Sequence, residues 1–462
     1  MDATRRIIVT FSQRIFVGIT AYIIVIATPP SVGGSEELRL GEPDPTACYL
    51  IQTTLKADGH LKVDGEGESN ELPIRVWGSL RYRQVTVDSP ANKSPLIVRL
   101  FQAAKADIVV DGRPDSSELS PLRRLIALRE IEGDYVAYSP QGPLTRGDLE
   151  LISVQCDPAI VRQLLPTRSL KLGESWRADE KLLADVCGLE AITASDVKCK
   201  LLSARRDVAE IQLEGKAEGI SLSAKSELQI EGTLTFDRTR NSLSRISVTI
   251  QEKRDAGLFA PGFDMEAHIE STISPARPPK ELSAESLAGL RAEPESAALA
   301  IEFASPTMGI ALVHQRDWRV TMHRRDLLVM RLVRDGTFVA QCNVTPAGKA
   351  SEDREKDATK FQSQVAAAVG KNAGQIDEIS TAQTELGTDI LRVTANGQSG
   401  ETPITWVYYL LTQKDGARMA VVFTLASEQL KAFGGSDHDL IGSLRMIEEN
   451  RSAEKPNGQL ER

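Results

Sequence analysis

The chain has 462 residues, more than one ordinary domain holds, so two or three domains are expected. Hydrophobic residues make up 41% and charged residues 26%, which is typical of a soluble globular protein, while aromatic residues make up only 5%. The net charge of −9, with Lys and Arg interleaved among Asp and Glu, argues against a nucleic acid as the partner.

The first 34 residues predict export. Arg5, Arg6 and Arg14 precede an apolar run over residues 15–28, and prolines and small residues follow it. This order is the pattern of a secretory signal peptide. The run of about 14 residues is shorter than the roughly 20 that span a bilayer. The alternative is an uncleaved anchor, which would then be the protein's membrane contact. The expected location is the periplasm or the cell envelope.

Five cysteines occur, and an odd number does not indicate a disulfide framework. The interpretation favoured is five small buried side chains. Export would permit disulfides, and Cys187 with Cys199 is then the expected pair. The pairing stays open for the whole set, which is Cys48, Cys156, Cys187, Cys199 and Cys342.

Residues 36–273 predict an α+β domain with strands first, then a few helices, then strands. Alternation around Asp58-Gly59 predicts a hairpin with its turn there. Ser120-Pro121 and Asp157-Pro158 predict capped helices over residues 121–130 and 158–165. Apolar residues alternate from residue 197 to 272, which predicts an antiparallel meander with one buried face.

Residues 274–298 contain four prolines and no aromatic residue. They predict a linker between two domains. Leu282, Leu287 and Leu290 favour a short helix over residues 281–293, so the linker is expected to be a semi-rigid spacer.

Residues 299–447 predict a second α+β domain. Its clearest helix covers residues 353–369, with apolar residues at spacing four. Strands are expected at 375–383, 386–395 and 404–412, and the turn at Lys414-Asp415-Gly416 leads into another. A final helix is expected over residues 437–446, and residues 448–462 form a polar tail predicted to be disordered.

The chain shows three resemblances to known groups of proteins. In the second domain, DWRV (317–320), SQVAAAVG (363–370), the Asp415-Gly416 turn and DLIGSLRMI (439–447) occur in an order that resembles the PsbP/DcrB-like superfamily. That resemblance implies an α-β-α sandwich on an antiparallel sheet. The first domain resembles the LolA/LolB-like lipoprotein carriers, which implies a curved antiparallel sheet that holds acyl chains. LTRGDLELIS (144–153) and EGTLTFDRTRNSLSRISV (231–248) resemble segments of large exported planctomycete proteins.

The chain shows no catalytic motif: it contains no G-x-S-x-G, P-loop, H-E-x-x-H or dinucleotide-binding fingerprint. HRRD at 323–326 is interpreted as an exposed charged strand end or turn. GGSDHDL at 434–440 is interpreted as a helix start, with Ser436 or Asp437 as the N-cap. The five histidines are scattered along the chain. No catalytic residue, metal site or cofactor is therefore predicted.

One weak ligand site is predicted, on the alternating run over residues 74–87. Arg75, Trp77, Arg81 and Arg83 share one side of that run, which suits an anionic headgroup; the alternative is a solvated sheet face. The predicted function is a non-enzymatic exported protein that binds a lipid or other apolar ligand in its first domain. The alternatives are an envelope component that binds another protein, and a hydrolase whose site the sequence does not show.

Overall fold

The computed structural model describes residues 37–39, 44, 46–64, 69–87, 95–131, 134–221, 224–257, 261–291, 293–334, 337–384 and 387–447. The predicted signal peptide and C-terminal tail lie outside these residues. The chain divides into two compact units, Met1–Leu299 and Ala300–Arg462, termed the N-terminal and C-terminal units.

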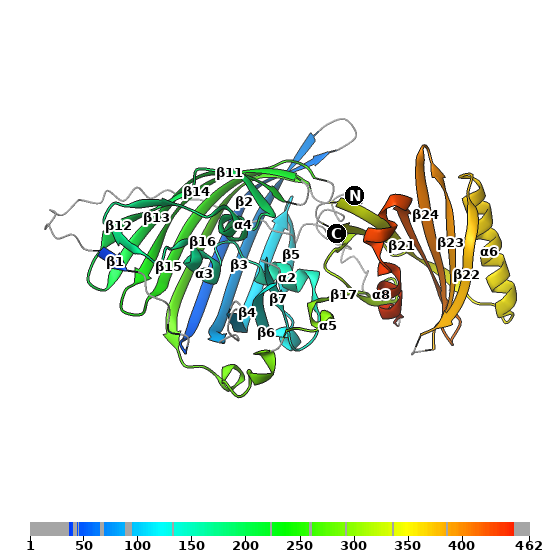
Figure 1. The fold of residues 1–462 in the computed structure, drawn as a ribbon, viewed down its shortest axis with the longest axis horizontal. Coiled ribbons are helices and arrows are strands. Elements are labelled where there is room, and N and C mark those ends of the chain that lie inside the picture. The colour runs from blue at the N-terminus through cyan, green and yellow to red at the C-terminus, as the bar shows by residue number, and fades with distance from the viewer. Residues whose placement is uncertain are drawn as a thin grey trace, which may run out of the picture. The chain divides into compact units, whose positions relative to one another are not determined.

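A thirteen-stranded antiparallel sheet dominates the N-terminal unit (Figure 1). Eleven strands form its main path, and two more, β11 (Ala191–Ser195) and β5 (Arg113–Glu118), pair with β13 and β4. In sheet order, the path is β10 (Ser175–Arg177), β12 (Lys198–Ala204), β13 (Val208–Ser221), β14 (Ala224–Asp237), β15 (Ser242–Arg254), β16 (Gly262–Ala276), β2 (Cys48–Asp64), β3 (Ser69–Val87), β4 (Leu96–Val110), β6 (Leu125–Ile131) and β7 (Asp134–Tyr138).

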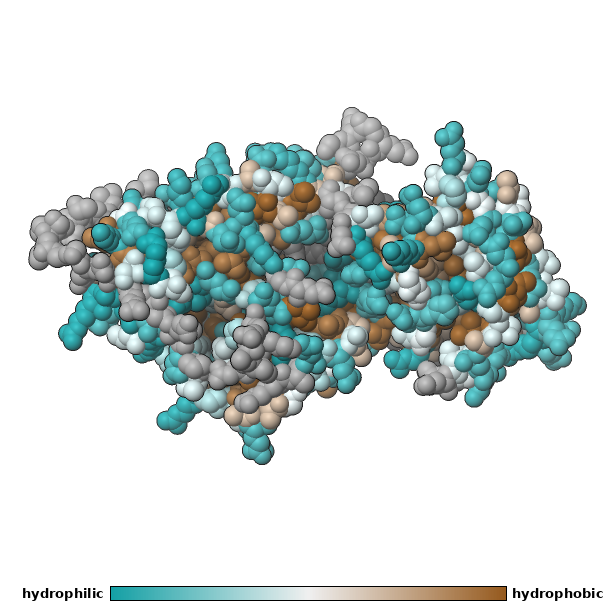
Figure 2. Space-filling view, in the orientation of Figure 1, coloured by the Kyte–Doolittle hydropathy of each residue, from teal (hydrophilic) through white to brown (hydrophobic). Residues whose placement is uncertain are grey.

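The period-two pattern of the sequence explains this sheet. Along β14, buried residues such as Leu228, Ile230 and Leu234 alternate with exposed polar ones, because successive side chains of a strand point to opposite faces. Strands β12 to β16 pair in chain order, so the predicted antiparallel meander is confirmed. In the view of Figure 2, hydrophilic side chains cover most of each unit and apolar ones form small separate areas.

Short helices lie against the buried face of this sheet (Figure 1). They are α2 (Arg146–Ile152), α3 (Pro158–Val161) and α4 (Glu180–Cys187). Asp157 and Asp179 cap α3 and α4 by accepting backbone N–H bonds, as such residues do at helix starts. The remaining short elements are β1 (Glu37–Arg39), η1 (Pro121–Arg123), β8 (Leu144–Thr145), η2 (Arg162–Leu164) and β9 (Ser169–Lys171).

Two local predictions in this unit are wrong. The Asp58-Gly59 pair makes no turn and lies inside β2, where a Cβ atom on Gly59 would come within 2.3 Å of the main-chain oxygen of Asp264. Glycine there permits close approach of β16. The predicted helix over residues 121–130 is only the 3-10 turn η1, followed by β6. Pairing of β6 with β4 and β7 overrides the helical pattern.

Residues 274–298 do not form the predicted spacer. Strand β16 continues to Ala276, and the predicted helix over 281–293 is replaced by the 3-10 turns η3 (Lys280–Leu282) and η4 (Ala288–Arg291), followed by α5 (Ser296–Leu299). Leu282 and Leu287 are buried in a cluster with apolar residues of β3 and β4. This segment therefore packs as part of the N-terminal unit.

The C-terminal unit is built on a seven-stranded antiparallel sheet. In sheet order, its strands are β19 (Trp318–His323), β20 (Leu328–Arg334), β21 (Thr337–Lys349), β25 (Ala417–Ala426), β24 (Thr402–Thr412), β23 (Asp389–Ser399) and β22 (Gln375–Gln383). Helix α6 (Arg354–Gly370) lies beside β22 and β23 (Figure 1). The other elements are β17 (Ile301–Ser305), β18 (Ile310–His314), η5 (Ser427–Gln429), α7 (Leu430–Phe433), α8 (Ser436–Ser443) and β26 (Arg445–Met446).

The predicted α+β class, with its α-β-α sandwich in the second domain, is wrong. Strands account for 59% of the structure and helices for only 18%. Among the helices of the described residues, only α6 is longer than eight residues, because most helix-like patterns of the sequence form single turns or strands. The fold is thus mainly β. No helix in the described part of the chain is both long and apolar enough to cross a bilayer.

Candidate binding pocket in the C-terminal unit

The four predicted ligand residues lie on β3 and point to the same face, as their alternation predicts. They are Arg75, Trp77, Arg81 and Arg83. That face is opposite the buried one, and Trp77 is 43% exposed. Arg75 lies 3.4 Å from Asp58, and Arg81 donates a 3.0 Å hydrogen bond to Gln102. These are contacts across an open sheet surface, and ligand binding there stays a prediction.

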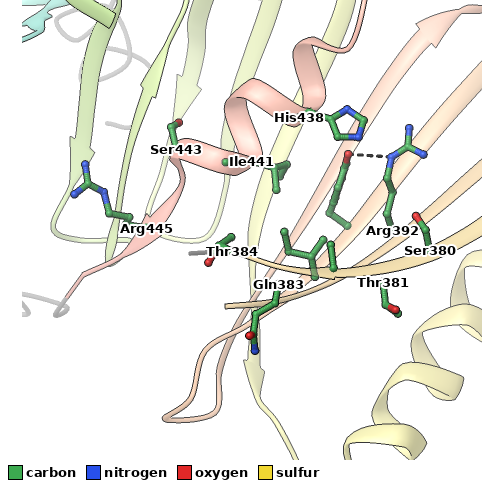
Figure 3. A pocket seen from close by; sticks show the side chains of 13 residues that line it. Ser380, Thr381, Gln383, Thr384, Arg392, His438, Ile441, Ser443 and Arg445 are labelled. Atoms are coloured by element: carbon green, nitrogen blue, oxygen red, sulfur yellow. Dashed lines mark hydrogen bonds between the residues drawn. The ribbon is translucent and has the colours of Figure 1, made fainter. Parts of the chain in front are cut away.

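A better-formed pocket, with a volume of about 690 Å³, lies in the C-terminal unit (Figure 3). The end of β22 and residues of β23, β24 and α8 surround it. Its lining residues are Ser380, Thr381, Ala382, Gln383, Thr384, Ile390, Arg392, Tyr409, His438, Ile441, Gly442, Ser443 and Arg445. The volume is within the range of sites for small molecules.

The buried carboxylate of Asp437 organises one wall of this pocket. Asp437 is 1% exposed and lies on the first turn of α8. Its Oδ2 accepts a 2.6 Å hydrogen bond from the Tyr409 hydroxyl and lies 3.3 Å from Nη2 of Arg392. Its Oδ1 lies 3.1 Å from Nδ1 of His438. One carboxylate therefore fixes three polar side chains of the pocket.

The guanidinium of Arg392 keeps part of its hydrogen-bonding capacity. Its Nε donates to the Tyr409 hydroxyl at 3.0 Å, and its Nη1 lies 3.4 Å from Glu378. With Nη2 on Asp437, these contacts use three of the five N–H groups of an arginine. The side chain is 20% exposed, and Arg392 is one of the residues that line the pocket.

The ionisation of this wall follows from its surroundings. Burial raises the pKa of Tyr409, and the adjacent Asp437 carboxylate raises it further, so the phenol keeps its proton at neutral pH. Burial lowers the pKa of Arg392, but its contacts with Tyr409 and Asp437 outweigh that effect and the pKa is raised. Both groups are therefore hydrogen-bond donors under ordinary conditions.

The lining favours an anion with an apolar body. The lining residues include two arginines and a histidine but no carboxylate, although the whole chain has a net charge of −9. Ile390, Ile441 and the Tyr409 ring supply apolar surface, and the lining also includes serine and threonine residues. No group of three metal-ligating side chains occurs among the described residues.

Sequence reasoning missed this pocket because it explained GGSDHDL as a helix cap. The N-cap of α8 is Gly435, with no capping side-chain bond, so the prediction of Ser436 or Asp437 as the cap is wrong. The HRRD histidine, His323, lies 2.6 Å from the Ser305 hydroxyl. Ser305 is fully buried and accepts a backbone N–H bond from Met308, which indicates a structural turn.

The comparisons with known proteins assign no family. No family model matches the chain, and no curated protein matches it. The translocator domain of autotransporter NalP from Neisseria meningitidis is similar over 82% of this chain and 88% of that chain, at 8% identity and a TM-score of 0.13. OmpF of Salmonella typhi, in complex with daunomycin, is similar over 85% of this chain and 99% of that chain, at 7% identity and a TM-score of 0.13.

DynF, from the dynemicin biosynthesis pathway of Micromonospora chersina, is similar over 58% of this chain and 98% of that chain, at 8% identity and a TM-score of 0.13. Scores this low carry no argument about fold or function. The resemblances to PsbP-like and LolA-like proteins are not tested by these comparisons and stay predictions.

Proposed function

We propose that the protein is an exported, non-enzymatic binding protein whose C-terminal unit binds a small organic anion in the pocket around Arg392. The observation that carries the proposal is the lining, which combines arginine donors with apolar surface; the carboxylates of Asp437 and Glu378, which pair with Arg392, are not among the lining residues. Hydrogen bonds between a guanidinium and an anion are among the stronger ones in proteins. The apolar residues would then select for a carboxylate attached to an apolar group.

The Asp437 network supports binding rather than turnover. Asp437 holds Arg392 and Tyr409 before any ligand arrives, and preorganisation lowers the entropic cost of binding. A hydrolytic mechanism would need a nucleophile beside His438. Of the two serines on α8, Ser436 donates its hydroxyl to the main-chain oxygen of Phe433, and Ser443 donates to the main-chain oxygens of Val313 and Leu440. The hydrolase alternative stays a prediction without a structural argument.

Calorimetry of the full chain with benzoate as the probe tests the proposal, with neutral benzamide as the uncharged comparison. We expect benzoate to bind and benzamide not to bind at the same concentration. Arg392→Gln should weaken benzoate binding at least about tenfold, because it removes a charge-assisted contact. Glu378→Gln should strengthen binding, because Glu378 competes for Nη1 of Arg392.

The matched control is Arg331→Gln. Arg331 lies on β20 of the same sheet, contacts Gln341 and is outside the pocket lining. Equal effects of the two arginine substitutions, or equal binding of benzoate and benzamide, would refute the anion site. Inorganic phosphate and sulfate form a further arm, and tighter binding of either one would show that the apolar surface plays no part.

A second candidate function concerns the N-terminal unit and rests on its sheet. One face of the sheet is apolar over several adjacent strands, and α3 and α4 cover it. A carrier of a lipid or other apolar ligand, as the LolA-like resemblance implies, would expose this face by moving the helices. Mass spectrometry of an organic extract of the purified protein tests this, and repeated absence of any bound lipid would exclude it.

A further inference from the structure

Two cysteines meet where α3 begins and α4 ends in the N-terminal unit. Cys156 immediately precedes Asp157, the N-cap of α3, and Cys187 is the last residue of α4. The backbone N–H of Cys156 donates a 2.8 Å hydrogen bond to the carbonyl oxygen of Val186. The Gln155 side chain donates a 2.8 Å bond to the carbonyl oxygen of Cys187. The two main chains are therefore in direct contact.

These contacts place an upper limit on the separation of the two cysteines. The hydrogen bond from Cys156 N to Val186 O is 2.8 Å long. With standard peptide bond lengths on either side of it, the Cα atoms of Cys156 and Cys187 lie within about 7 Å of each other. Disulfides span Cα separations of about 4.4–6.8 Å. Both side chains are buried, at 1% and 0% exposure.

The backbone at Cys156 indicates that its side chain matters. Its φ is +56°, in the left-handed region that favours glycine and disfavours residues with a Cβ atom. A glycine would satisfy the turn at lower cost. The residue at this position instead carries a thiol beside a second thiol.

We propose that Cys156 and Cys187 form a disulfide that ties α3 to α4 in the exported protein. The bond forms by exchange with a disulfide oxidant, either a small-molecule disulfide or a dithiol oxidoreductase of the exported compartment. Two protein thiols become one S–S bond, and the oxidant's disulfide is reduced to two thiols. This pairing differs from the sequence-based expectation of Cys187 with Cys199. It depends on export, but it is independent of the anion pocket.

The burial of both sulfurs dictates when the bond forms. Burial raises the pKa of the Cys156 thiol to about 12 and raises that of Cys187 well above its usual value, with a Cys156 thiolate raising it further. Thiolates are the reactive species, so the thiols of the folded, reduced protein exchange slowly. The bond therefore forms during folding, before the two helices close over it.

The test refolds the full chain from urea with oxidised and reduced glutathione, denatures it again and alkylates the free thiols. Intact mass should show three alkylated cysteines of the five, and peptide mapping should link Cys156 to Cys187. Cys199→Ser should keep that link, whereas Cys156→Ser and Cys187→Ser should abolish it. Because the readout is taken on denatured protein, each variant needs to fold only long enough for the bond to form and need not stay folded.

Two further measurements complete the test. The oxidised protein should unfold at a temperature higher by roughly 5 °C or more than the reduced one, because the bond closes a loop of about 30 residues. Folded, reduced protein exposed to oxidised glutathione should stay unlinked for much longer than refolding protein. Five alkylated cysteines after oxidative refolding, or a link between Cys187 and Cys199, would overturn the proposal.

Discussion

A buried ion pair in the N-terminal unit provides the sharpest stability test. The guanidinium of Arg99 makes two hydrogen bonds of 2.6 and 2.7 Å to the carboxylate of Asp157. Both side chains are almost fully buried, at 5% and 7% exposure. Asp157 also caps α3 by accepting the N–H of Ala159 at 2.9 Å. The substitution Asp157→Ala therefore removes a counter-charge and a helix cap together.

The expected cost follows from those two losses. Leaving a buried arginine without its partner costs about 3–5 kcal/mol. Losing the cap costs about 1 kcal/mol more, so Asp157→Ala should lower the free energy of unfolding by about 4–6 kcal/mol. Asp157→Asn keeps an oxygen for the cap and should cost about 1 kcal/mol less than the alanine variant. These values are large against the 5–15 kcal/mol that stabilises typical domains.

Pulse-labelling hydrogen exchange across a urea series gives the stability of each unit from its own peptides. Peptides of the C-terminal unit are the internal control, and the substitution should leave their hydrogen exchange unchanged. The matched variant is Arg245→Ala, which breaks a 2.7 Å ion pair between Arg245 and Glu270. The Arg245 side chain is 56% exposed and the Glu270 side chain 38% exposed. It should cost less than about 1 kcal/mol. A cost below about 1 kcal/mol for Asp157→Ala would refute the reasoning.

Two further predictions concern pH and packing. Burial lowers the pKa of His323 below its usual value of 6.5, so the unfolded protein binds a proton more readily than the folded protein does. The free energy of unfolding of the C-terminal unit should therefore be highest above pH 6.5 and fall by up to about 1.4 kcal/mol per pH unit below it. Thermal melts that show no such fall relative to His323→Asn would contradict this. Gly59→Ala should lower stability by about 1–3 kcal/mol or prevent folding, because its Cβ would overlap main-chain atoms of β16, whereas Gly289→Ala, with no atom within 4 Å of the added Cβ, should be neutral in the same melts.

The antiparallel meander was predictable because its signal is local. Alternation along a strand depends only on which face is buried, and β12 to β16 each show it. The helix expected over residues 121–130 failed for the opposite reason. Its residues Ile126, Ala127 and Leu128 are consecutive and buried between two strands, a pattern that a short window cannot separate from a helix. Enough such errors accumulated to make the predicted fold class wrong.

The pocket could not be found from local patterns because its residues come from separate elements. Arg392 and Tyr409 lie directly opposite one another on β23 and β24, and Asp437 reaches them from α8. In the sequence each has an ordinary explanation: a charge on a strand, an aromatic in an apolar run and an acid in a first helical turn. Only the register of the two strands and the placement of α8 bring Arg392, Tyr409 and Asp437 together.

The segment after residue 273 shows how composition can mislead about where a domain ends. Its prolines disfavour regular secondary structure and so suggest a tether, but they do not prevent packing. Leu282 and Leu287 are buried in one apolar cluster with residues of the sheet, which are Cys48, Val85, Val87, Leu96, Val98, Ala127 and Tyr138. A chain cut at residue 273 would expose these apolar side chains together, and a cut at 299 would not. The boundary is therefore set by what the leucines cover and lies about 25 residues beyond the proline-rich start of the segment.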